Sequence, residues 1–145
     1  MHLQFLLRNR REAILDNFVE RVKLGPLDAG KLSTTLIRDG LPTFLERLAA
    51  DLEVWTVPEL PPSRRDPATS GGEHGEQRQA LGVDVVQVAR EWAVLQDVIL
   101  EMLMAEGHTL VLAEYQLFSR HINGASIEAI RQHCEASARD ALVQS

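Results

Sequence analysis

Hydrophobic residues recur through most of the chain at spacings of three and four, which place them on one face of an α-helix. Four long stretches show this pattern: residues 3–24, 41–52, 84–106 and 110–142. Two shorter helices are predicted over 33–39 and 74–81, and glycines end most of these elements: Gly25 before Pro26, Gly40, Gly82 and Gly107. No stretch stands out as a strand. The sequence therefore predicts an all-α fold, an antiparallel bundle of about five to six helices in a single domain of residues 1–145, with a globin-like arrangement as the alternative.

Residues 53–73 break the helical pattern. This stretch contains four prolines and the Gly71-Gly72 pair, which do not favour a regular helix. We predict a long loop, with Trp55, Val57 and Leu60 folding back as apolar anchors, because long loops without anchors are uncommon in compact domains.

The stretch 84–106 is predicted to be the long central helix. Its apolar residues cover about half of the helix circumference at about 100° per residue, and its acidic residues lie on the other side. Gln96 projects near the middle of the apolar arc, close to Trp92 and Ile99, so its amide needs a partner. That partner is either a backbone group or another helix, or else Gln96 contacts a ligand.

The last long helix has an apolar stripe that changes face. Val111, Tyr115, Phe118 and Ile122 form one stripe, and the second half forms another, rotated by about 120°. A kink at Asn123-Gly124 explains the change, or the second half packs on a different surface such as a second subunit. We expect a homodimer, with a dimer or output face at Ile127, Ile130 and Cys134.

Composition narrows the classes of function. The formal net charge is −6 at pH 7 and the pI is about 5.3, which argues against nucleic acid as a partner. The most apolar stretch, 83–105, carries several charged residues and is a poor membrane span, so no membrane insertion is expected. One cysteine forms no intramolecular disulfide, and a cytoplasmic location fits best.

No catalytic or metal-binding motif appears in the sequence. The five histidines are scattered without the spacing that places two imidazoles on one helix face, so neither a metal nor a cofactor is expected. His121 and His133, the only histidines within a long helix, are considered for haem and are expected at the surface or at an edge. Cys134 is expected to be a quiet buried thiol, and the basic residues Arg8, Arg10 and Arg11 a solvated helix face.

One segment carries a family resemblance. His74-Gly75, Arg78 and Gly82, followed by a helix with Glu91 and Trp92, is similar to the N-terminal domain of RsbRD-type RsbT co-antagonists. That domain is also found at the front of bacterial sensor histidine kinases. Trp92 stands where tyrosine is usual, and Gln96 where arginine is common. The earlier stretch that begins at Leu41-Pro42 is also similar to a helix of this family.

The resemblance implies an all-α, non-catalytic input domain that acts on a downstream signalling domain, most simply that of a two-component sensor histidine kinase. On this hypothesis the last helix is the output element. The four residues His74, Arg78, Gly82 and Glu91 are then a structural clasp between two helices.

A second hypothesis is a helical protein that binds a small molecule or cofactor in a pocket between helices. The candidate lining residues are Trp55, Trp92, Gln96, Tyr115 and Phe118. The identity of such a ligand is unknown.

Overall fold

The computed structural model describes residues 2–24, 38, 40–56 and 68–144. It contains six helices in this part of the chain: α1 (His2–Asn9), α2 (Arg11–Lys23), α4 (Leu41–Thr56), α5 (Ala68–Ala80), α6 (Val85–Ala105) and α7 (Leu112–Gln144). No strand occurs among the described residues. The prediction of an all-α helical bundle is confirmed.

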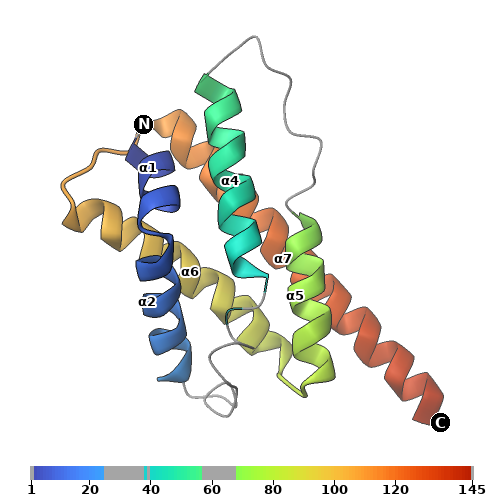
Figure 1. The fold of residues 1–145 in the computed structure, drawn as a ribbon. Coiled ribbons are helices and arrows are strands. Elements are labelled where there is room, and N and C mark those ends of the chain that lie inside the picture. The colour runs from blue at the N-terminus through green and yellow to red at the C-terminus, as the bar shows by residue number, and fades with distance from the viewer. Residues whose placement is uncertain (1, 25–37, 39, 57–67, 145) are drawn as a thin grey trace.

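The helices are arranged in two layers (Figure 1). The segments α1–α2, α4 and α5 run roughly alongside one another with alternating direction, and the long helices α6 and α7 cross behind them. The closest associations are between α5 and α7, α6 and α7, α1 and α4, and α2 and α6. The far end of α7 extends past the rest of the bundle.

One hydrophobic cluster joins five of the six helices. It includes Phe18 of α2, Phe44 of α4, Trp92 of α6 and Phe118 of α7, all at most 2% exposed. Helix α5 contributes no residue to this cluster. Because hydrophobic burial is the dominant stabilising term in most domains, α5 must be held by other contacts.

Helix boundaries follow local signals that the sequence shows. At Gly82, which has a φ of 77°, the Val83 N–H donates to the Arg78 carbonyl, as in a Schellman motif. Gly107, with a φ of 73°, ends α6 in the same way. Asp84 caps the start of α6 by accepting a hydrogen bond from the Val86 N–H at 2.7 Å. Both predicted glycine stops are confirmed.

The contact between α5 and α7 is unusually close. A Cβ atom added to Gly71 would lie 2.0 Å from the carbonyl oxygen of Ala125, and one added to Gly75 would lie 1.9 Å from that of Ala129. Real Cβ atoms do not approach an oxygen so closely, so both positions require glycine. Small residues spaced four apart on each helix let the two backbones meet directly.

The predicted loop over 53–73 is wrong at both ends. Helix α4 continues to Thr56, and α5 already begins at Ala68, so Gly71 and Gly72 are helical. Glycine disfavours a helix in isolation, but here the close packing against α7 stabilises the helical conformation. The remaining part of the loop, with Val57 and Leu60, lies outside the described residues, as does nearly all of the predicted helix 33–39.

The first predicted helix is divided in two at Arg10, whose backbone (φ −115°, ψ 21°) departs from helical values. The division lets α1 pack mainly on α4 while α2 packs mainly on α6. The predicted single helix over 3–24 is therefore wrong.

Helix α7 is one continuous element from Leu112 to Gln144, and its ribbon runs without a sharp bend (Figure 1), in contrast to the kink predicted at Asn123-Gly124. Nor does the buried face rotate. After Phe118 and Ile122 it continues along the same side through small or polar residues, namely Ala125, Ala129, His133 and Ala136. Val111 and Tyr115, predicted to be in the stripe, are 54% and 39% exposed.

No helix in the described part of the chain is sufficiently long and apolar to span a bilayer.

Candidate functional site

The polar centre of the structure is a buried ion pair between α5 and α6. The guanidinium of Arg78 donates from Nε to both carboxylate oxygens of Glu91 at 3.1 Å, and from Nη2 to Oε1 at 2.9 Å. The side chains are 0% and 1% exposed. Arg78 also donates to the side-chain oxygen of Gln77. Removing one partner of such a pair is strongly destabilising, because the other charge is left buried and uncompensated.

His74, one turn before Arg78 on α5, lies at the same carboxylate. Its Nε2 is 3.5 Å from Glu91 Oε2, and its side chain is 2% exposed. The imidazole also packs edge-on against Trp92, with ring centroids 5.4 Å apart, and Trp92 packs against Phe44 at 5.0 Å. The structure thus brings His74, Arg78 and Glu91 together, and Gly82 ends the helix that carries the first two.

The contacts with His74 and Arg78 decide the charge of Glu91. Burial by itself raises the pKa of this carboxyl, but the contacts with His74 and Arg78 lower it by more, so the net pKa of Glu91 lies below its ordinary value. Glu91 is therefore ionised in the folded protein at neutral pH, and it holds α5 as a carboxylate.

Two further buried imidazoles connect α7 to other parts of the bundle. His121 contacts Asp51 of α4 at 2.8 Å, and His133 contacts the carbonyl oxygen of Val83, between α5 and α6, at 2.5 Å. They are only 4% and 8% exposed. The expectation that both lie at the surface or at an edge is wrong, because each finds a polar partner that offsets its burial.

The described residues of the predicted pocket lie in different surroundings. Trp92 and Phe118 belong to the hydrophobic cluster, Gln96 is half-buried, and Tyr115 is 39% exposed. The side chain of Trp55 lies outside the described residues.

A pocket of about 260 Å³ among the described residues lies elsewhere. It is lined by Leu7, Arg8, Arg11 and Glu46.

Three basic residues near the start of the chain are predicted to form a solvated helix face. Two of them are engaged in ion pairs at the surface, Arg8 with Glu53 at 2.7 Å and Arg10 with Glu106 at 2.5 Å.

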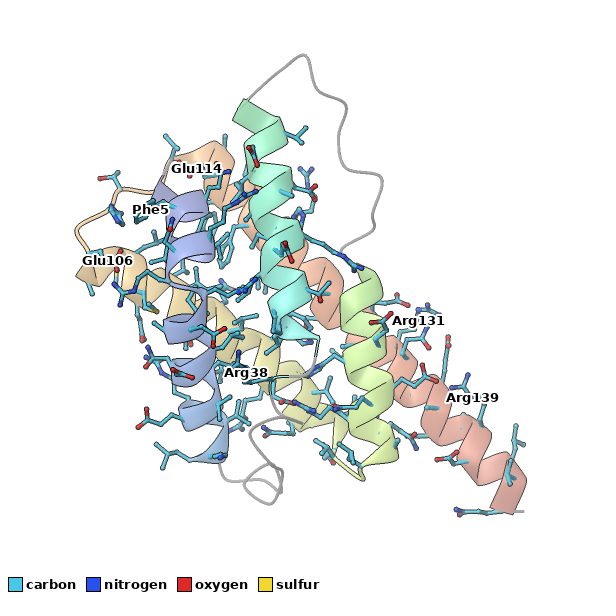
Figure 2. The ribbon with its side chains drawn as sticks, viewed as in Figure 1. Phe5, Arg38, Glu106, Glu114, Arg131 and Arg139 are labelled. Atoms are coloured by element: carbon cyan, nitrogen blue, oxygen red, sulfur yellow. The ribbon has the colours of Figure 1, made fainter. Side chains whose placement is uncertain are left out.

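The predicted dimer or output face lies on α7. Ile127 is 66% exposed, Ile130 is half-buried and Cys134 is exposed. The expectation of a buried thiol is wrong within this chain, since Cys134 lies on the side of α7 away from the buried Ala129 and His133. Figure 2 shows Arg131 and Arg139 along the same half of the helix.

Sequence reasoning missed several buried polar and small residues. Gln87 is 1% exposed although it lies outside the apolar arc of α6. The pairs Gly71/Gly75 and Ala125/Ala129 share a spacing of four, and that spacing is the signal that would have found the α5–α7 contact. Among the described residues, no group of three or more histidine, cysteine or acidic side chains is placed to hold a metal.

Comparisons of the chain with family models, with curated proteins and with solved structures give no match. The resemblance to the RsbRD-type domain stays a prediction that rests on the residues quoted above.

The lowered pKa of Glu91 makes a prediction about acid stability. A carboxylate whose pKa is lower in the folded state stabilises the fold above its ordinary pKa, and this contribution is lost as the pH falls through the folded value. At pH 7 we expect Glu91→Gln to lower the free energy of unfolding by about 3 kcal/mol, because Arg78 is left buried without its counter-charge. The difference from the wild type should shrink below about pH 4, measured by urea unfolding from pH 3 to 7.

The matched control is Glu76→Gln. Glu76 pairs with Arg139 of α7 at 3.4 Å, but both side chains are more than half exposed, so its removal should leave stability nearly unchanged. Equal losses for the two variants at pH 7, or a Glu91→Gln deficit that does not vary with pH, would contradict this description of the ion pair.

Proposed function

We propose that this chain is a cytoplasmic, non-catalytic input domain of a bacterial signalling protein, most simply a sensor histidine kinase, with α7 as its output helix. The observation that supports this proposal most is that α7 has a buried part and a fully exposed part. Its buried positions run from Glu114 to Ala136, whereas residues 137–144 are all exposed. One continuous helix therefore has one part fixed in the bundle and another that presents its surface outward (Figure 1).

The buried polar side chains support a role in transmission. Four of these side chains contact an element other than their own. Arg78 of α5 and Glu91 of α6 contact each other, while from α7 His121 contacts α4 and His133 contacts the turn between α5 and α6. Polar contacts of this kind specify one arrangement of helices, and a change in one contact alters how the others are held. The resemblance to the RsbRD-type domain supports the same function.

The proposal includes a homodimer formed through the outward side of α7. Ile127, Ile130 and Cys134 follow spacings of three and four on this side, which suits packing against the same helix of a second copy. Two copies of the downstream signalling domain would then be held side by side.

A fusion tests the output role. The chain is joined after Ser145 to the dimerisation and catalytic core of a sensor histidine kinase, with zero to seven alanines inserted at the junction. Because the helix turns by about 100° per residue, autophosphorylation should rise and fall with a period of about 3.5 residues. A rate that is independent of the number of inserted residues would contradict transmission through α7.

The dimer is tested on the chain alone by light scattering during size-exclusion chromatography. The wild type should have the mass of a dimer, and Ile130→Glu the mass of a monomer, since the charge would be buried at the contact. Val111→Glu is the control, because Val111 is exposed near the other end of α7 and should leave the dimer intact. A monomeric wild type would remove this part of the proposal.

A further inference from the structure

A small pocket lies beside the break between α1 and α2, where these helices run alongside α4 (Figure 1). Its volume is about 260 Å³, and it is lined by Leu7 and Arg8 of α1, Arg11 of α2 and Glu46 of α4. Leu7 is 1% exposed and belongs to the hydrophobic cluster, whereas the other three residues are charged. Pockets for drug-sized ligands measure about 300 to 1,000 Å³, so this one suits a smaller molecule with charged groups.

Two charges of opposite sign line this pocket without neutralising each other. Arg11 is half-buried and Glu46 is exposed, and the side chain of neither forms an ion pair or hydrogen bond with another described residue. A guanidinium carries only donors and a carboxylate only acceptors. The pocket therefore presents unused donors from α2 and unused acceptors from α4.

Arg8 adds a second guanidinium to the same pocket. It forms an ion pair with Glu53 at 2.7 Å, but the two side chains are 49% and 53% exposed. An ion pair in such contact with water contributes little to stability. Arg8 can thus exchange this partner for a ligand at little cost.

The arrangement of charges selects the kind of ligand. A guanidinium binds a carboxylate through paired, charge-assisted hydrogen bonds, so the two arginines suit an anionic group. An anion without a cationic group would leave Glu46 facing a charge of its own sign. A molecule that carries both a carboxylate and an ammonium group satisfies Arg11 and Glu46 together.

We propose that this pocket binds a small zwitterion of the amino-acid class. The carboxylate of the ligand lies on Arg11 and Arg8, and its ammonium group lies on Glu46. The site itself stands on the pocket alone. Only its consequence rests on the proposed function, namely that such a ligand would be the signal that the input domain receives.

The position of the pocket suits that consequence. Arg10, the residue before Arg11, forms an ion pair with Glu106, the residue that caps the end of α6. The turn after Glu106 leads into α7. A bound ligand would therefore lie next to a contact that reaches the start of the proposed output helix.

Isothermal titration calorimetry of the wild-type chain with each standard amino acid in turn tests the site. At least one should bind with a Kd below about 1 mM. The amides that shift in the proton–nitrogen NMR spectrum should include those of residues 7–11 and 46. The same compound without its amino group, and inorganic phosphate, should each bind at least about tenfold more weakly, because neither can donate to Glu46.

Two substitutions separate the two ends of the ligand. Arg11→Gln and Glu46→Gln should each weaken binding of the amino acid by at least about tenfold. For the compound without its amino group, Arg11→Gln should weaken binding further and Glu46→Gln should not. The matched controls are Arg139→Gln and Glu76→Gln, which make the same chemical changes in an exposed ion pair between α7 and α5 and should keep the wild-type affinity.

Absence of binding by every standard amino acid up to about 10 mM would overturn the site, as would an affinity that Arg11→Gln leaves unchanged. Phosphate that binds as tightly as the best amino acid would overturn the assignment to a zwitterion. The wild-type titrations need no variant, so they decide even if a variant does not fold. Because all of them use the chain alone, failure of the kinase fusion would remove the output role of α7 and leave the site, whereas absence of binding would remove the site and leave the output role.

Discussion

The structure depends on how closely α5 approaches α7. At Gly71 and Gly75 the two backbones meet with no room for a side chain, and this distance determines where the rest of α5 lies. Arg78 and His74 follow on the same helix, and both reach Glu91 of α6. A shift of α5 by the radius of one methyl group would pull the guanidinium away from a carboxylate that is only 1% exposed.

This constraint also explains how a helix without large apolar residues is part of the bundle. Helix α5 adds nothing to the hydrophobic cluster, so its attachment comes from backbone contact, the buried ion pair and polar contacts at the surface. Such contacts depend on geometry more than burial does, since hydrophobic attraction is not directional. The buried histidines of α7 obey the same rule, because each has a specific polar partner. The proposed role in transmission would make use of this dependence on geometry.

The sequence predicts the parts of this fold that depend on hydrophobic spacing and on turn chemistry. Gly82 and Gly107 end their helices because both need a positive φ, and the apolar arc of α6 forms part of the core. Arg78 and Glu91 were singled out by resemblance rather than by pattern. In contrast, helix propensity places Gly71 in a loop, because it counts glycine as unfavourable and takes no account of a neighbouring backbone. Gly75 lies in a predicted helix, but nothing in that prediction indicates its close contact with α7. His121 and His133 are predicted at the surface or at an edge for a related reason, since a polar residue is counted as exposed until its partner is known.

The most direct test of this account is the stability of Gly75→Ala beside Gly124→Ala, both measured by denaturant unfolding. Both glycines lie inside helices, but a Cβ at Gly124 meets nothing within 4 Å. The account predicts that Gly75→Ala lowers the free energy of unfolding by about 3 kcal/mol, because α5 must move away from α7. Gly124→Ala should raise it by about 0.5 to 1 kcal/mol through helix propensity. A Gly75→Ala variant as stable as the wild type, or more stable, would contradict the close contact on which the site depends.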